Sequence, residues 1–110
     1  MAIVKNLTVD KYSTFERMFS FLDKNKVPFD LSGYTPIAQI RKATKQEVVA
    51  EFYCEIVPPA SSGRIILKLD YDDTANTIPG KYSYDVLLVS NSEKLRAVEG
   101  IVEITPNITE

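Results

Sequence analysis

Three aspartates crowd one short stretch of the sequence, LDYDDT at residues 69–74, and they are the first candidates for chemistry. Asp70, Asp72 and Asp73 supply the clustered carboxylate oxygens that Ca²⁺ prefers. Their spacing lacks the glycine and the distal glutamate of an EF-hand loop. The alternative is a solvated loop in which the aspartates cap a short turn. The pattern by itself assigns no metal, and whether this loop binds calcium stays open.

Two pairs of glutamates have a spacing that excludes glycosidase chemistry. Glu51 and Glu55 lie four residues apart on one side of a predicted strand, which separates them by about 13 Å. Glycosidase carboxyl groups lie about 5–9.5 Å apart. The same distance argument applies to Glu99 and Glu103. We expect all four to be solvent-facing charges that keep their strands soluble.

Cys54 is the only cysteine, and the chain contains no histidine. Without histidine there can be no Ser-His-Asp or Cys-His nucleophilic site, and most transition-metal sites lose their commonest ligand. Cys54 falls on the apolar face of its predicted strand, where a thiol is an inert small hydrophobe. We therefore predict that the protein is not an enzyme and has no catalytic residues, no metal and no cofactor.

Composition and net charge limit which partners the protein can bind and in which compartment we expect it to fold. The 110-residue chain has a net charge of −2, which argues against nucleic-acid binding because that requires a basic surface. No stretch approaches the roughly 20 apolar residues of a membrane helix. The opening MAIVKNLTVD has no secretory apolar run, and one cysteine allows no intrachain disulfide. We expect synthesis in a reducing cytoplasm, with no nucleic acid or membrane as partner.

Apolar residues alternate with polar ones along most of the chain, and a period of two indicates β-strands. The clearest case is VVAEFYCEIV at 48–57, where every second residue from Val48 to Ile56 is apolar. A single helical turn is predicted within 71–77. The predicted strands cover residues 3–9, 14–22, 35–42, 48–57, 64–70, 81–89 and 95–105.

Short strands with turn residues every 8–12 positions are typical of a sandwich of two sheets. The fold class predicted is all-β, an immunoglobulin-like β-sandwich of about seven antiparallel strands. Residues 1–110 are predicted to form one domain. Pro106 is expected to end the last strand and leave 106–110 as a C-terminal tail.

The stretch TIPGKYSYDV, residues 77–86, places Tyr82 two residues after Gly80, where the chain enters the sixth predicted strand. A tyrosine at this place in such sandwiches packs at the core edge, and its hydroxyl bonds to upstream backbone. We predict a structural tyrosine corner at Tyr82, with its acceptor in the segment 73–76. Alternation favours this interpretation over tyrosines displayed for binding.

Apolar residues on the outward side of predicted strands are the candidate interface. Exposed apolar side chains of this kind can mark an assembly surface. The alternative is that loops or neighbouring side chains cover them. The candidate interface residues are Val49, Tyr53, Val57, Leu87 and Val89.

Four stretches resemble a known family: PFDLSGYTPIAQIRK, IVPPASSGRIILKLD, TANTIPGKYSYDVLL and RAVEGIVEITPNIT. The combination of G-x-Y-x-Y-D-V with E-G-x-V-x-I-T-P, over nearly the whole chain, resembles the immunoglobulin-like domain of tailed-phage virion proteins. That domain is related to the N-terminal domain of phage baseplate upper proteins. The chain resembles the small stand-alone copies of this domain that occur in contractile-tailed phages, including those of cyanobacteria.

The resemblance implies a non-enzymatic structural component of the virion, acting through protein–protein contacts at the tail, baseplate or neck, or decorating the capsid. It implies other virion proteins as partners, several copies or a homo-oligomer in the particle, and no catalytic residues. The chain ends at Glu110, without the longer stalk of baseplate upper proteins, which favours a small accessory protein. The alternative is a host-surface or glycan-binding module that uses Tyr71 and the segments 71–77 and 90–94.

Overall fold

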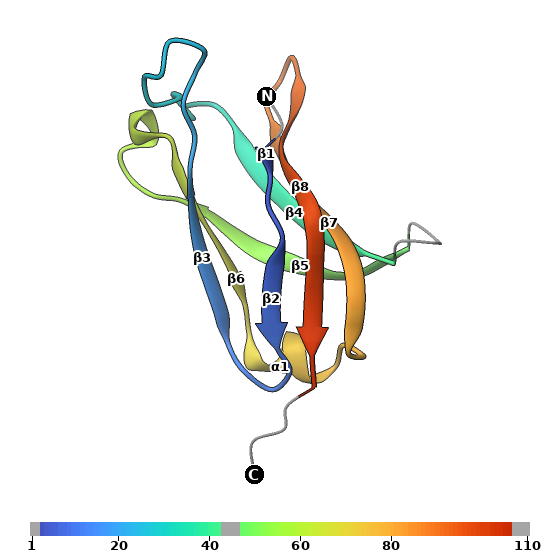
Figure 1. Cartoon of the computed structure of the whole chain (residues 1–110). Coiled ribbons are helices and arrows are strands. Elements are labelled where there is room, and N and C mark those ends of the chain that lie inside the picture. The colour runs from blue at the N-terminus through green and yellow to red at the C-terminus, as the bar shows by residue number, and fades with distance from the viewer. Residues whose placement is uncertain (1–2, 43–46, 107–110) are drawn as a thin grey trace.

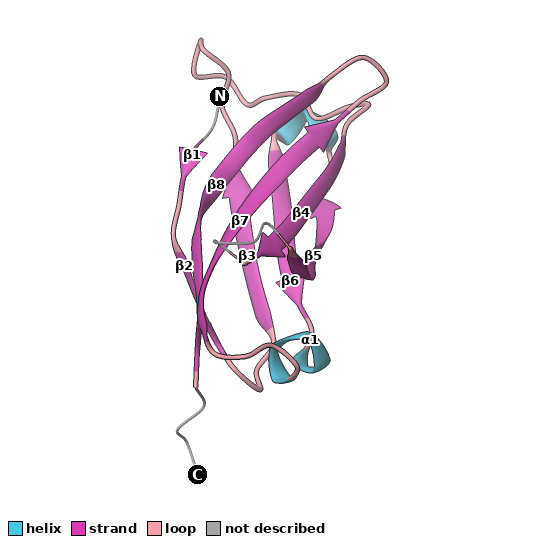
Figure 2. Cartoon of the chain, turned by 90° about the vertical axis from the view of Figure 1, so that its right-hand side faces the viewer, coloured by secondary structure: helices cyan, strands magenta, loops and turns pink. Residues whose placement is uncertain are grey.

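The computed structural model describes residues 3–42 and 47–106, and nearly all of its regular structure is β (Figures 1 and 2). The predicted tail lies outside the described residues except for Pro106. The strands are β1 (Ile3–Val4), β2 (Leu7–Asp10), β3 (Phe15–Ser20), β4 (Thr35–Arg41), β5 (Val48–Ile56), β6 (Arg64–Leu69), β7 (Gly80–Val89) and β8 (Lys94–Thr105). A 3₁₀ turn, η1 (Ala60–Ser62), and one helix, α1 (Tyr71–Ala75), complete the elements.

The strands form one continuous sheet in the order β1-β8-β7-β4-β5-β6-β3, with β2 also beside β8. The sheet curls into two layers because β5 changes partner along its length (Figure 1). Its first half pairs with β4, and its second half pairs with β6. The result is the predicted all-β, immunoglobulin-like sandwich, with the apolar faces of both layers turned inward.

The N-terminal segment departs from the prediction of one antiparallel strand. It forms two short strands, and both run parallel to β8. Between these two strands the segment passes Gly100 on β8, where a Cβ atom would lie 2.2 Å from the Lys5 carbonyl oxygen. The Tyr84 hydroxyl donates to that same oxygen at 2.6 Å, and the Asn6 side-chain oxygen accepts from the Ile101 N–H at 3.0 Å. A glycine is therefore required for the N-terminal segment to lie on β8.

Two β-bulges add a residue to one strand and so change which side chains point inward. Between β4 and β5, Ile40 pairs with Ala50 and Arg41 pairs with Val48, which leaves Val49 as the extra residue. Val49 packs against the core. Between β7 and β8 a second register shift leaves Ala97 unpaired, and it is fully buried.

The core lies between the two layers and is almost entirely apolar. Phe19, Phe21, Ile65 and Leu67 fill it from the β3–β6 layer, and Val98 is one of its counterparts in β8. The alternation in the sequence predicts the buried positions of the β3–β6 layer, because successive side chains of a strand point to opposite faces. It does not predict Val98, because the bulge buries the adjacent Ala97 as well.

The predicted helical turn is present as α1, and the aspartates cap it. Asp70 and Asp73 form a capping box, in which the Asp70 N–H donates to Asp73 Oδ2 at 3.4 Å. Thr74, which is buried, ties this end of the molecule to the start of β3, since its hydroxyl donates to the Ser13 carbonyl at 2.6 Å. Of the described helices, neither is long and apolar enough to cross a membrane.

Candidate protein-interaction surface

Tyr82 lies at the entry to β7, is 8% exposed, and donates a hydrogen bond to the Ile78 carbonyl. The acceptor expected in 73–76 was wrong. Two carbonyls of that segment instead accept hydrogen bonds from Thr77. Asp73 accepts from the Thr77 hydroxyl at 2.7 Å, and Thr74 accepts from the Thr77 N–H at 3.4 Å. The tyrosine therefore closes the turn that follows α1.

The five candidate interface residues do not form one exposed patch. The bulge turns Val49 toward the core, and Val57 is half-buried just beyond β5. Tyr53 is 62% exposed, but it lies where β5 crosses between layers, with Lys68 Nζ 6.0 Å from its ring centroid. Leu87 and Val89 lie on the outward side of β7 and are half-buried. Alternation within a single strand does not predict which of these side chains are exposed, because it takes no account of bulges or of a strand that changes sheets.

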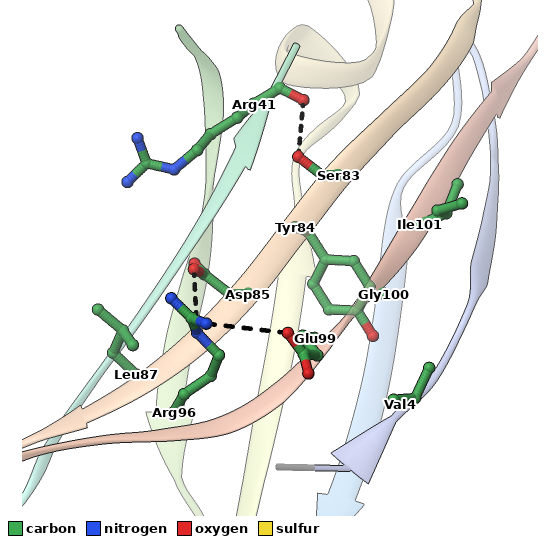
Figure 3. Close-up of a pocket in the computed structure, with 10 residues that line it drawn as sticks. All are labelled: Val4, Arg41, Ser83, Tyr84, Asp85, Leu87, Arg96, Glu99, Gly100 and Ile101. Atoms are coloured by element: carbon green, nitrogen blue, oxygen red, sulfur yellow. Dashed lines mark hydrogen bonds and ion pairs between the residues drawn. The ribbon is translucent and has the colours of Figure 1, made fainter. Parts of the chain in front are cut away.

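We call the outward-pointing side chains of β4, β7 and β8 the outer face. In the pairing of β7 with β8, Ser83 lies opposite Ile101, Asp85 opposite Glu99, and Leu87 opposite Arg96. A shallow depression of about 580 Å³ lies on this face (Figure 3). It is lined by Val4, Arg41, Ser83, Tyr84, Asp85, Leu87, Arg96, Glu99, Gly100 and Ile101.

Charged side chains cross the middle of the outer face. Arg96 Nε lies 3.7 Å from Asp85 Oδ2, and its Nη1 lies 3.9 Å from Glu99 Oε1, so one guanidinium bridges β7 and β8 (Figure 3). Exposed pairs of this kind add about 0–1 kcal/mol to stability. Their effect here is to hold the Arg96 side chain across the depression.

Exposed apolar side chains flank these charges on both sides. Val4 is 70% exposed and Ile101 is 46% exposed on the β1–β8 side, and Ile37 on β4 is 38% exposed beside Leu87. An open surface that mixes apolar and charged side chains suits a protein–protein contact better than a small ligand, because small-ligand sites are concave and mostly enclosed. Sequence reasoning missed Ile37, although its position beside inward-facing Ala38 was a usable signal.

Two side chains that carry nucleophilic atoms are Ser83 on β7 and Cys54 on β5. The Ser83 hydroxyl donates to the Arg41 carbonyl at 3.4 Å. Burial raises the pKa of the Cys54 thiol to about 11, which keeps it protonated at neutral pH. Within residues 3–42 and 47–106, no group of three or more His, Cys, Asp or Glu is placed to hold a metal.

A second exposed feature lies at the α1 end of the molecule. Tyr12 and Tyr71 are 47% and 52% exposed, and their ring centroids lie 6.3 Å apart. Lys11 Nζ lies 5.2 Å from the Tyr12 ring centroid. The two rings are tilted by 42° to each other, so the feature is an exposed aromatic pair with a lysine ammonium beside it.

No family model matches this chain, and no curated protein sequence matches it. Solved structures do resemble it in fold. The N-terminal domain of phage TP901-1 ORF48 has 9% sequence identity and a TM-score of 0.55, and the match covers 94% of this chain and 96% of that chain. A chicken TCR has 13% identity and a TM-score of 0.52, over 94% of this chain and 54% of that chain. At these identities the likeness is one of fold, and it agrees with an immunoglobulin-like sandwich.

Proposed function

We propose that this protein is a non-enzymatic structural component of a tailed-phage virion, and that it works through protein–protein contacts of the outer face. The observation that carries the proposal is the fold shared with the N-terminal domain of phage TP901-1 ORF48 over nearly the full length of both chains. The motif resemblance between Gly80 and Pro106 points to the same class of phage domain.

The outer face is suited to repeated, individually weak contacts. Its apolar residues are spread on either side of the Arg96 ion pairs, so a partner gains from both shape and charge. In a symmetric particle such contacts recur, and many weak interfaces hold through multivalency. The partners are then other virion proteins at the tail, baseplate, neck or capsid, and the protein is made in the host cytoplasm and ends in the virion.

Electron microscopy of purified particles labelled with an antibody against this protein tests the proposal. Label at a regular position on the particle is expected. Particles assembled with Ile101→Glu should carry about tenfold less of the protein, because a charge replaces an exposed apolar contact. Val27→Glu makes the same change at a 54%-exposed loop position away from the outer face and should have no effect.

Two results contradict the proposal. If the protein stays in the lysate and particles carry no label, it is not a virion component. If Ile101→Glu and Val27→Glu are incorporated equally, the outer face is not the contact surface.

The second candidate is a host-surface or glycan-binding module, favoured by the exposed Tyr12–Tyr71 pair. Aromatic faces can stack on sugars or other ligands at little entropic cost. Binding of the purified protein to host cells or glycans, without other virion proteins, and its loss in Tyr71→Ala, would favour this function over the first.

A further inference from the structure

Strand β3 has a hydrogen-bonded neighbour on one side only, since within the described residues it pairs with β6 alone. In the same register, the Phe21 N–H donates to the Gly63 carbonyl at 2.7 Å. Backbone groups of alternate residues point to the same side of a strand in an antiparallel pair. The backbone N–H and C=O groups of Arg17 and Phe19 therefore point toward β6.

The intervening residues direct their N–H and C=O groups away from β6, toward the open edge. This row of donors and acceptors can pair with one more extended chain. The residues concerned are Glu16, Met18 and Ser20.

A groove of about 280 Å³ runs along this edge, between β3 and β1. Both rims carry a cation and an exposed apolar side chain: Lys5 and Ile3 on the β1 side, Arg17 and Met18 on β3. In the part of the chain that the structure describes, neither Lys5 nor Arg17 makes an ion pair. The groove is thus a strand-sized site with unneutralised positive charge on both sides.

Arg17 occupies a position that alternation gives to the core, between Phe15 and Phe19. Its side chain is nevertheless exposed, because the layer is open at this edge. An inward-pointing charge on an edge strand discourages pairing with neutral or basic strands. A strand with a carboxylate facing Arg17 escapes that penalty and gains a charge-assisted contact.

We propose that the open edge of β3 takes an extended acidic segment of a partner protein as an added strand. The segment's backbone pairs with Glu16, Met18 and Ser20, and its carboxylates lie against Arg17 and Lys5. A second copy offering its own β3 edge fits poorly, since it brings another unpaired Arg17 to the same groove and like charges repel. The site is separate from the outer face and does not depend on the phage assignment.

The probes are two synthetic peptides, acetyl-SVEVETS-amide and acetyl-SVKVKTS-amide, which differ only in the charge on one face. Titration is followed by amide-resolved NMR of the full chain. The glutamate peptide should shift the amides of Glu16, Met18 and Ser20 most strongly. It should bind about tenfold or more tightly than the lysine peptide, and higher salt should weaken it.

Three variants separate charge from backbone pairing. Arg17→Glu should reverse the preference between the two peptides, whereas Lys24→Glu, the same charge change at an exposed loop position, should leave it unchanged. Met18→Pro removes an edge N–H that does not bond to β6, so it should abolish binding while the fold is kept. If Met18→Pro unfolds, Arg17→Glu still decides the outcome.

Three results would overturn the proposal. The first is no amide shift with either peptide, which would mean that Arg17 only prevents other strands from pairing with this edge. The second is equal affinity for both peptides. The third is concentration-dependent dimerisation of the free protein, measured by sedimentation and abolished by Met18→Pro, because the edge then belongs to a second copy.

Discussion

At one end of the sheet, β8 is covered by β1 and β2, whereas at the other end β3 presents an unpaired edge. The covering strands are two and four residues long and are interrupted at Lys5 and Asn6. The β3 edge is six residues long and continuous. Short, interrupted edge strands resist further pairing, and long flat ones invite it. The two ends of one sheet are therefore suited to different tasks: the first closes the fold, and the second is available to a partner.

The same comparison explains where the N-terminal segment lies. Gly100 has no side chain to collide with the Lys5 carbonyl, and hydrogen bonds made by Tyr84 and Asn6 hold the segment beside β8 at this point. Along β3, Arg17 takes the place of an apolar side chain. The N-terminal segment therefore pairs with β8, and within the described residues no strand pairs with the outer edge of β3.

Amide hydrogen exchange should show the largest difference. Along β3, we expect Glu16 and Met18 to exchange about a hundredfold faster than Arg17 and Phe19, because their N–H groups lack a partner. In β8, Val102 and Glu103 lie between β2 and β7 and should not alternate in this way. Equal protection along β3 would mean that its edge is covered in solution.

Gly100→Ala is expected to destabilise the protein by about 1–3 kcal/mol. The new Cβ meets backbone atoms of Lys5, at 2.2 Å from the oxygen, so the N-terminal segment must move. Urea denaturation gives the free energy of unfolding, and Ile101→Ala, an exposed neighbour, is the control with a change within about 0.5 kcal/mol. An unchanged stability in Gly100→Ala would show that β1 and β2 are not seated as described.

Tyr84→Phe should cost about 0.5–1.5 kcal/mol, because it removes the hydroxyl that donates to the Lys5 carbonyl. Burial raises the pKa of Tyr84 from about 10 to about 12. A raised pKa in the folded state means that its contribution to stability is complete below pH 10 and is lost as the pH rises toward 12. As the pH rises from 10 toward 12, the free energy of unfolding should fall less in Tyr84→Phe than in the parent protein. Urea unfolding at pH 8 and at pH 11 measures this difference. A parallel decline in both proteins would contradict this role of Tyr84.

Met18→Ala should have the smallest effect, a change in unfolding free energy within about 0.5 kcal/mol. The side chain is 51% exposed at the open edge, so little buried area is lost. Thermal unfolding followed by circular dichroism measures it. A loss of several kcal/mol would show that another element packs on this edge.

The alternation of apolar residues was sufficient to predict the fold class and most strand positions, and the segment 71–77, which lacks it, was predicted to hold the helical turn found as α1. Phe19, Phe21 and Leu67, which alternate with other residues in the sequence, lie in the core, because the period of side-chain direction in a strand is fixed by local geometry. Composition separately showed that the chain has no histidine, the residue on which most catalytic and transition-metal sites depend. These features are local or compositional, so a single sequence contains them.

Tertiary structure alone decided which of the outward residues meet. The bulge that turns Val49 inward, the passage of β5 from β4 to β6, and the pairing of the N-terminus with β8 all depend on strands far apart in the sequence. A shift of one residue in register exchanges the two faces of a strand, and nothing within the strand itself records that shift. For this reason the sequence determined a β-sandwich with an apolar interior, and only the packing of the strands set the outer face and left the β3 edge open.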